Sequence, residues 1–463
     1  MHRSHCVKPV LDPDFIPAAL WTRDYQRRIE EAGACEPVSI ALLRPGDSCS
    51  VFRTRILPPG GGSEEANRRH MERTLKMFLW QRSGNRVLIS GCDALVPHLR
   101  EAYSPGGVRQ FDNDLVGKGI YGTGLEIMAC PERELPAARE HELSLGGNLD
   151  GCRIGFDLGG SDRKCAAVID GRVVFSEEVE WAPYFEPDPA YHIDGIQDTL
   201  SRAAEHLPRV DAIGGSAAGV YVNNEVRFAS LFRGVASDVF ESRIRRLFLD
   251  LRARWGNVPF DVANDGEVTA LAGAMSMKRH ALLGLSMGTS LAAGYITAAG
   301  HLTSWINELA FAPLDYREDA PVDEWSGDRG VGAQYLSQQA VARLAPLAGF
   351  DFPDEMPYPE QLLEVQAQMR NGDARAADIY STIGTYLGYS LAHYAEFYDI
   401  QNVLLLGRVA TGDGGGVIIE QAARVLREEF PARADQIEIH TLNETQKRHG
   451  QAVAAASLPA LAS

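Results

Sequence analysis

Short apolar runs alternate with glycine- and proline-rich turns along the whole chain, a pattern that predicts alternating strands and helices. Residues 64–82 place apolar side chains three or four positions apart, which predicts an amphipathic helix. Residues 86–90 (RVLIS) predict a strand, and residues 92–103 predict the helix that follows it. Residues 104–107 (SPGG) end that helix. We therefore expect residues 1–150 to form a small α/β extension.

The rest of the chain contains a duplicated pattern. Residues 154–161 (IGFDLGGS) align without a gap with residues 283–290 (LGLSMGTS). Each copy predicts an apolar strand, a glycine turn and a second strand that ends in a turn at Gly171 or Gly300. Such a repeat predicts two related lobes that face each other. It also explains the uncharged residues 281–300 as a buried hairpin rather than a membrane span.

Composition and charge exclude several classes of protein. Of the 463 residues, 45% are hydrophobic and 23% are charged, which is typical of globular proteins. The net charge is −17, and the first 150 residues carry 19 basic and 20 acidic side chains, so the excess of acid lies in the remainder. An acidic surface repels a phosphate backbone, and we therefore expect no nucleic-acid partner.

One basic run stands out within the extension. It predicts a solvated helix face, and phosphate or DNA binding is the alternative. The run consists of Arg68, Arg69, Arg73, Lys76, Arg82 and Arg86.

The cysteines and the N-terminal residues indicate in which cellular compartment the protein is expected. Seven cysteines without a C-x-x-C pair favour buried thiols in a reducing environment over disulfides or a zinc site. Asp12 and Pro13 interrupt the start of the chain before any apolar core, which argues against a signal peptide. We expect a cytoplasmic protein that does not associate with membranes.

The two glycine turns of the repeat are candidate phosphate-binding loops, because their backbone N–H groups could hold a nucleotide's phosphates. The first turn carries Asp157, a carboxylate suited to a hydrated Mg²⁺, where the second has Ser286. The second turn offers the hydroxyls of Thr289 and Ser290. Lys164, on the strand that leaves the first turn, is a further phosphate-binding candidate, although strand lysines are often simply solvated.

A carboxylate at a strand-to-helix junction is the candidate general base. Residues 258–264 predict a strand and residues 268–277 a helix, with Asn264 and Asp265 at the junction, where α/β proteins bind ligands. Asp265 could accept a proton from a substrate hydroxyl. It could equally cap the helix, and the residues alone leave both roles open.

Taken in order, these motifs resemble those of the ROK family of sugar kinases and repressors, within the actin/hexokinase/Hsp70-like superfamily. The resemblance covers about residues 152–460. It rests on residues 157–161 (DLGGS, first phosphate motif), 214–219 (GGSAAG, a turn beside the sugar), Asn264-Asp265 (catalytic motif), Gly288-Thr289 (second phosphate motif) and residues 403–408 (VLLLGR, adenosine motif).

The resemblance implies an α/β fold with two duplicated lobes of the actin/hexokinase-like (ribonuclease H-like) type. In this arrangement residues 151–275 form the first lobe, residues 440–463 close it with a helix, and residues 276–439 form the second lobe. Residues 1–150 lie outside the resemblance, and their role stays open.

The resemblance also implies transfer of a phosphoryl group from ATP to a sugar hydroxyl. Asp265 would be the catalytic base, and Asp157 would hold Mg²⁺ through water. The residues implied to bind the nucleotide are Gly159, Gly160, Ser161, Gly288, Thr289, Ser290 and Gly407, and those implied to bind the sugar are Ser216, Ala217, Gly219, Asn264 and Glu308.

Other family positions are substituted. The family's four zinc ligands are replaced by Phe311, Glu324, Ser326 and Val331. Phenylalanine and valine cannot bind zinc, so we expect no structural zinc. A second acid that contacts the sugar in the family is replaced by Ala333.

These substitutions leave an alternative function open, that of a ROK-like sugar sensor with weak turnover. A DNA-binding repressor would need a winged helix within residues 1–150, and no clear helix-turn-helix pattern occurs there. The expected partners are a sugar-like small molecule and a nucleotide, and a homodimer is left open.

Overall fold

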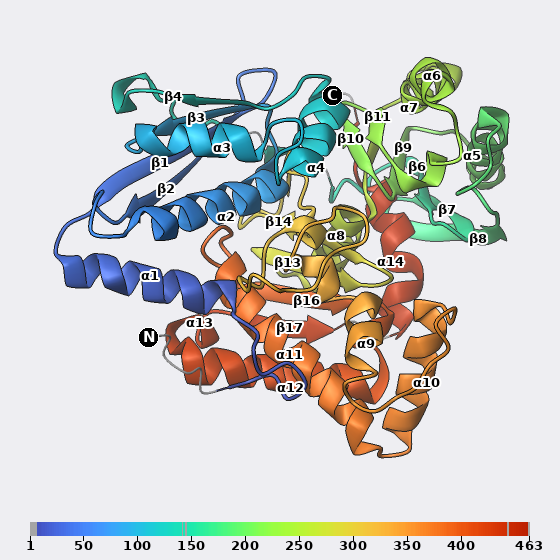
Figure 1. The fold of residues 1–463 in the computed structure, drawn as a ribbon. Coiled ribbons are helices and arrows are strands. Elements are labelled where there is room, and N and C mark those ends of the chain that lie inside the picture. The colour runs from blue at the N-terminus through green and yellow to red at the C-terminus, as the bar shows by residue number, and fades with distance from the viewer. Residues whose placement is uncertain (1–6, 141, 144–145, 442–443, 462–463) are drawn as a thin grey trace. The chain divides into compact units, whose positions relative to one another are not determined.

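The computed structural model describes residues 7–140, 142–143, 146–441 and 444–461 (Figure 1). The chain divides into two compact units, and each unit combines segments that are far apart in the sequence. Unit 1 comprises Met1–His141, Leu285–Ala292 and Ser304–Ile439, and unit 2 comprises Glu142–Gly284, Ala293–Thr303 and His440–Ser463. The N-terminal extension thus shares a compact unit with residues 304–439.

Unit 2 is built on a five-stranded sheet with the strand order β12-β9-β6-β7-β8. Strands β12, β9 and β6 run parallel, whereas β6, β7 and β8 form antiparallel hairpins. The carboxyl ends of the three parallel strands therefore meet at one edge of the sheet. The strands are β6 (Cys152–Leu158), β7 (Asp162–Ile169), β8 (Arg172–Glu180), β9 (Ala212–Ala217) and β12 (Phe260–Asn264).

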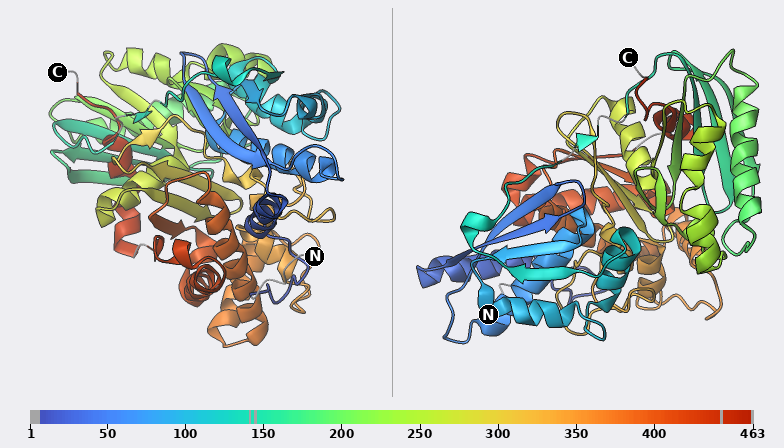
Figure 2. Two further views of the ribbon diagram at one scale, coloured as in Figure 1. Left: turned by 90° about the vertical axis from the view of Figure 1, so that its left-hand side faces the viewer. Right: turned by 90° about the horizontal axis from the view of Figure 1, so that it is seen from above.

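Helices cover both faces of this sheet because its central strands are apolar on both sides. All seven residues of β6 are buried. Helix α5 (Pro189–Ala204) packs on one face, and α14 (Glu444–Ala456) packs on the other against β6 and β9 (Figures 1 and 2). Unit 2 also contains α6 (Ser237–Val239), α7 (Leu247–Arg254), α8 (Asp265–Met277) and the strand pairs β10 (Val220–Val222) with β11 (Glu225–Phe228) and β5 (Glu142–Leu143) with β15 (Leu302–Thr303).

Two glycines explain how α14 comes so close to the sheet. A Cβ atom on Gly155 would lie 1.9 Å from the carbonyl oxygen of Ala452, and one on Gly214 would lie 1.7 Å from that of Ala455. Both distances are far below van der Waals contact, so no larger residue fits at either position without moving the helix.

A second sheet has the strand order β14-β13-β16-β17. Helices α11 and α12 pack closely against each other within unit 1. The strands are β13 (Leu282–Met287), β14 (Leu291–Ile296), β16 (Asn402–Leu406) and β17 (Glu438–Thr441), and the helices are α9 (Gln338–Leu344), α10 (Tyr358–Arg370), α11 (Ala374–Tyr394), α12 (Gly412–Glu429) and α13 (Pro431–Ala434).

The predicted hairpin in residues 281–300 is confirmed, since β13 and β14 are neighbouring strands of this sheet. The duplicated pattern is also confirmed, because β6 and β7 form the matching pair in unit 2. Within the described residues, no helix is long and apolar enough to cross a membrane.

The extension is an α/β structure, as predicted. The helix and strand expected at residues 64–82 and 86–90 are present with those bounds, and a short 3₁₀ turn leads into the next helix. Its sheet has the order β2-β1-β3-β4. The elements are α1 (Ala18–Ala32), β1 (Glu36–Leu43), β2 (Cys49–Ile56), α2 (Glu64–Arg82), β3 (Arg86–Ser90), α3 (Val96–Ala102), α4 (Gln110–Asp112) and β4 (Glu126–Ala129).

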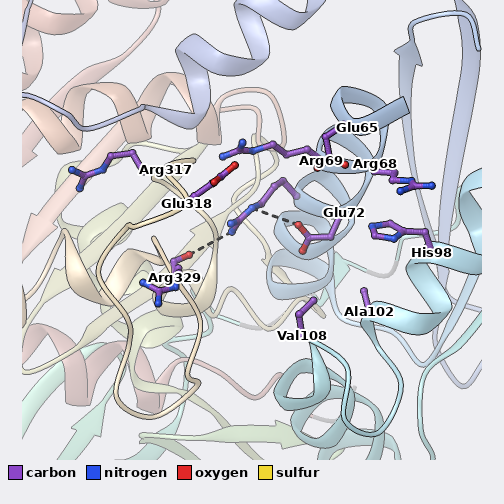
Figure 3. A pocket seen from close by; sticks show the side chains of 11 residues that line it. Glu65, Arg68, Arg69, Glu72, His98, Ala102, Val108, Arg317, Glu318 and Arg329 are labelled. Carbon is purple, nitrogen blue, oxygen red and sulfur yellow. Dashed lines mark hydrogen bonds and ion pairs between the residues drawn. The ribbon is translucent and has the colours of Figure 1, made fainter. Parts of the chain in front are cut away.

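The prediction of a solvated basic face on α2 is wrong for Arg73 and Lys76, although Arg68 is exposed. Lys76 is fully buried, and Arg73 is 9% exposed. Arg68, Arg69 and Arg73 line a pocket of about 230 Å³ together with acidic side chains of the same helix (Figure 3). The prediction failed because the partner of Lys76 that lies furthest along the chain, Asp328, is 252 residues away and leaves no mark on the helical pattern.

Candidate functional site

The edge of the unit 2 sheet gathers several candidate residues. In the parallel register Asp157 of β6 lies beside Ser216 of β9, and Asn264 of β12 lies beside Ala217. Asp265 follows directly as the first residue of α8. The carboxyl ends of parallel strands are the usual ligand-binding edge of an α/β sheet. The first phosphate motif, the turn motif of residues 214–219 and the catalytic motif therefore meet at this edge of the unit 2 sheet.

Asp157 is a buried carboxylate with two hydrogen-bond donors on one oxygen. Its Oδ1 accepts from Ser216 Oγ at 2.6 Å and from Gln451 Nε2 at 3.1 Å. Burial raises the pKa of Asp157 to about 6, the bond from Ser216 opposes that rise, and the charge of Asp265 adds to it. Ser216, predicted to bind the sugar, is fully buried and uses its hydroxyl to orient Asp157.

Sequence reasoning missed Gln451. This residue lies on α14, and its Nε2 donates to both Asp157 and Ser216 Oγ, the latter at 3.1 Å. The signal that could have found it lies in the strands, where Gly155 and Gly214 permit the close approach of α14. A helix that packs this tightly beside a buried carboxylate needs a polar residue at the contact.

The two residues at the start of α8 have different partners. Asn264 is the N-cap, because its Oδ1 accepts from Gly266 N at 2.8 Å, while its Nδ2 donates to the carbonyl oxygen of Gly219 at 2.8 Å. Asp265 is partly buried, and its Oδ1 accepts from Gly266 N at 3.0 Å. Burial raises the pKa of Asp265, and this backbone bond opposes the rise.

The first glycine turn joins β6 to β7. Gly159 N donates to the carbonyl oxygen of Asp162 at 2.9 Å, which closes the hairpin. A Cβ on Gly160 would lie 2.0 Å from Tyr184 Oη, so a larger residue there would have to displace the side chain of Tyr184. Ser161 is exposed and donates to Asp162, which also pairs with Lys164 Nζ at 3.0 Å.

The second glycine turn belongs to unit 1 and is more open. Gly288 N donates to the carbonyl oxygen of Ser290 at 3.0 Å, and Thr289 and Ser290 are exposed. Gly407, which follows β16, has a φ of 85°, and a Cβ there would lie 2.5 Å from the backbone of Met287. Glycine is therefore required at 407 by its backbone conformation and by the passage of the chain past β13.

Glu308 lies in unit 1, just before a 3₁₀ turn formed by Leu309–Phe311. Its backbone N–H donates to the carbonyl oxygen of Trp80 at 2.9 Å, in the last turn of α2. The extension thus contacts the segment that carries this candidate sugar-binding acid.

Comparison with known proteins identifies the fold. No protein-family model matches the sequence, and no curated protein matches it. Solved structures do match. A ROK hexokinase from Thermus thermophilus has a TM-score of 0.52 and 18% identity, with 66% of this chain and 97% of that chain covered. The chain has the ROK fold.

Two further matches agree with this assignment. A ROK family transcriptional regulator, a homologue of the E. coli MLC protein, has a TM-score of 0.54 and 18% identity over 67% of this chain and 79% of that one. A putative sugar kinase from Cytophaga hutchinsonii has a TM-score of 0.50 and 15% identity over 66% of this chain and 98% of that one. The predicted fold class is confirmed, and about a third of the chain lies outside each match.

The residues at the family's zinc positions have other partners in this ROK fold. The ring of Phe311 packs against Trp80 at 4.6 Å between centroids, and Val331 is fully buried. The other two positions form hydrogen bonds, from Ser326 Oγ to Asp323 Oδ2 (2.7 Å) and from Tyr358 Oη to Glu324 Oε1 (3.0 Å). Among the described residues, no group of three His, Cys, Asp or Glu side chains could hold a metal ion.

Asp157 nevertheless fits a water-mediated magnesium ion. Its Oδ2 accepts no hydrogen bond from the described residues, so one carboxylate oxygen remains available to a metal-bound water. A single carboxylate with several waters is a common way for proteins to hold Mg²⁺ beside phosphates.

Proposed function

We propose that the chain transfers a phosphoryl group from ATP to a hydroxyl of a sugar or sugar derivative. The observation that carries the proposal is the pair Asp157 and Asp265 at the carboxyl ends of β6 and β12, within a ROK fold. Burial raises the pKa of both carboxyls, and it does so at the edge of the sheet where ligands bind.

Asp265 would act as the general base. Its carboxylate would accept the proton of the sugar hydroxyl as that oxygen bonds to the γ-phosphorus, and ADP would leave with the electrons of the broken bond. The raised pKa brings the carboxyl closer to neutral pH, which makes it a better proton acceptor. Asn264 Oδ1 and Asp265 Oδ1 both accept from Gly266 N and so share the cap of α8, which leaves Asp265 Oδ2 for this role.

Asp157 would hold Mg²⁺ through water, with Ser216 and Gln451 orienting the carboxylate. When bound, Mg²⁺ neutralises charge on the nucleotide's phosphates. The exposed hydroxyls of Thr289 and Ser290 would donate to phosphate oxygens. Lys164 Nζ already pairs with Asp162, so its positive charge would be shared between that carboxylate and the phosphates.

The remaining contacts follow from the same proposal. Gly160 would offer its backbone N–H to the phosphates, while Gly159 and Gly288, whose N–H groups close their own turns, would shape the two phosphate loops. Gly407 would face the adenosine. Asn264 and Glu308 would hydrogen-bond sugar hydroxyls. Asn264 can still do so, because each end of its amide retains one unused hydrogen-bonding position.

The second candidate is a sugar-binding sensor with little or no turnover. Two observations favour it, the fold match to a ROK transcriptional regulator and the replacement of a sugar-contacting acid by Ala333. The pair Asp157 and Asp265 favours the enzyme, because a sensor needs neither a base nor a metal ligand.

Turnover measured over a panel of acceptors separates the two candidates. The purified chain with ATP and Mg²⁺ would be tested against hexoses, amino sugars and polyols in a coupled assay for ADP, and calorimetry would measure sugar binding in parallel. A kinase releases ADP and phosphorylated acceptor in equal amounts with at least one acceptor. Tight sugar binding without ADP release, from ATP or from polyphosphate as donor, would establish the sensor instead.

A further inference from the structure

The C-terminal end of α2 is capped by a segment more than 220 residues further along the chain. The last carbonyl groups of an α-helix have no partner within the helix and need one elsewhere. In α2 the carbonyl oxygen of Trp80 accepts from Glu308 N at 2.9 Å, and that of Gln81 accepts from Asn307 N at 3.1 Å. The carbonyl oxygen of Arg82 accepts from Arg44 Nη1 at 3.3 Å. Two of these carbonyls are therefore capped by the backbone that carries Glu308.

This backbone is held in a conformation that needs support. Asn307 has a φ of 50°, in the left-handed region that non-glycine residues seldom adopt, and it is 1% exposed. Its Oδ1 accepts from Tyr398 Oη at 3.0 Å. Together with the bond to Gln81, this contact fixes Asn307 and so sets the direction in which the chain enters Glu308.

A buried cation keeps α2 in register with the same region of unit 1. Lys76 lies one helical turn before Trp80, is fully buried, and pairs with Asp112 at 2.8 Å and with Asp328 at closer range. Trp80 Nε1 donates to Asp112 Oδ1 at 2.9 Å, and its ring packs on Phe311. Residues on both sides of the segment 312–327 are thereby attached to one turn of α2.

A second group of charges strengthens this attachment. Arg109 pairs with both Glu72 of α2 and Asp328. Arg73 Nη1 donates to the carbonyl oxygen of Arg329 at 3.4 Å. Both residues line the pocket together with Glu72, which Figure 3 labels. Buried ion pairs are costly to break because one charge is then left without a partner. The position of α2 is therefore strongly determined.

We infer that α2 is a positioning element of the sugar site, with Lys76 as the residue that keeps it in place. The helix holds Glu308 by its backbone and does not itself touch the sugar. The inference rests on the proposed function, in which Glu308 binds a sugar hydroxyl. It gives the N-terminal extension a role, since unit 1 would lack a fixed Glu308 without it.

Kinetics of Lys76 variants test the inference. In Lys76→Met the two aspartates lose their shared cation, and we expect the KM for the sugar to rise about tenfold or more, as for loss of a hydrogen bond to a charged group. The KM for ATP should stay within about twofold. Lys76→Arg should recover most of the loss, and Arg86→Gln, an exposed arginine of the same extension, should match the wild type.

A milder variant covers the case in which Lys76→Met does not fold. Trp80→Phe keeps an aromatic ring against Phe311 but removes the N–H that donates to Asp112. We expect a smaller rise in the sugar KM, about threefold to tenfold. Equal rises in the sugar and ATP KM values, or no rise in a folded variant of either kind, would overturn the inference.

Amide hydrogen exchange separates this inference from the proposed function. The amides of Asn307 and Glu308 should be protected in the wild type and should exchange at least about tenfold faster in Lys76→Met or Trp80→Phe. Peptides from β9 should exchange as before. Unchanged protection at residues 307–308 would refute the positioning role even if the chain binds no sugar. A faster exchange together with an inactive wild type would remove only the proposed function.

Discussion

At the start of α8, neighbouring residues divide two tasks between them. Asn264 uses one end of its amide to cap the helix and the other to hold the turn at Gly219. Asp265 lies one position later, where burial raises its pKa. The amide of Asn264 is suited to a structural role because it cannot titrate. The neighbouring carboxylate of Asp265 can still accept and release a proton.

This division predicts the effect of Asp265→Asn. The amide keeps the size of the side chain but cannot accept a proton, so turnover should fall by about 10²–10⁴-fold. Nucleotide affinity should change little, because the helix cap at Asn264 is untouched. A coupled assay and a nucleotide titration would measure the two effects. Near-normal turnover in the folded variant would remove Asp265 from the mechanism.

Asp157 should cost the protein stability when it is ionised. The pKa of Asp157 rises from 3.8 in the unfolded chain to about 6 in the folded protein. The protonated carboxyl therefore makes its full contribution to the free energy of unfolding below pH 3.8, and this contribution is lost as the pH rises through about 6. A shift of about two units corresponds to about 3 kcal/mol. We expect Asp157→Asn to be inactive yet more stable than the wild type above pH 6.

Urea unfolding between pH 4 and pH 8 would test this, with magnesium removed by a chelator. The stability difference between Asp157→Asn and the wild type should be small at pH 4 and grow to about 3 kcal/mol by pH 8. A difference that does not depend on pH would show that the burial of the charge is not its cause. The Asn side chain can still accept hydrogen bonds from Ser216 and Gln451, so their loss does not confuse the comparison.

At the scale of single elements, the packing of α14 on the unit 2 sheet depends on glycines in the strands that it covers. The two strands that it crosses carry Gly155 and Gly214 at the points of contact, and its residues 452 and 455 approach them through backbone carbonyls. This packing also brings Gln451 to Asp157. The last helix of unit 2 therefore supports both the sheet and the candidate site.

A matched pair of glycine substitutions tests this packing. Gly155→Ala should destabilise the protein by about 1–3 kcal/mol, because its Cβ would lie 1.9 Å from the carbonyl oxygen of Ala452. Gly416→Ala should stabilise it by about 0.5–1 kcal/mol, since Gly416 is exposed on α12 with no atom within 4 Å of a Cβ. Thermal or urea unfolding measures both. Equal effects of the two substitutions would contradict the proposed close contact.

At the scale of the whole molecule, charge bears on the choice between enzyme and repressor. The net charge is −17, and basic residues in the extension are tied to acids, as Lys76 and Arg109 are to Asp328. We predict no specific binding to duplex DNA at physiological salt, because binding needs basic groups that are free to replace counterions.

Fluorescence anisotropy with labelled duplexes, measured from low salt to about 0.15 M, would test this prediction. Weak binding that disappears with salt and ignores sequence would agree with it. A tight complex that depends on the sequence would contradict it and would move the repressor function ahead of the kinase. The fold match to a ROK regulator makes this measurement necessary.

Local patterns were enough to predict much of the fold and part of the site. The apolar runs and glycine turns predicted β6–β7 and β13–β14, and helical spacing predicted α2 with its observed bounds. These features depend on residues close together in the sequence, where periodicity and turn chemistry act. The strand-to-helix pattern further predicted that Asn264 and Asp265 lie at the carboxyl end of a sheet strand. The structure brings Asp157 to the same edge, because β6 and β12 both run parallel to β9.

Contacts between residues far apart in the sequence were decided by the tertiary structure alone. Asp157 meets Gln451 across 294 positions, and Lys76 meets Asp328 across 252, so neither pair leaves a spacing that the sequence could display. The same holds for the extension, whose α2 ends on the backbone of Asn307 and Glu308. A buried charge or an open helix end requires some partner, but packing of the whole chain chooses which residue supplies it.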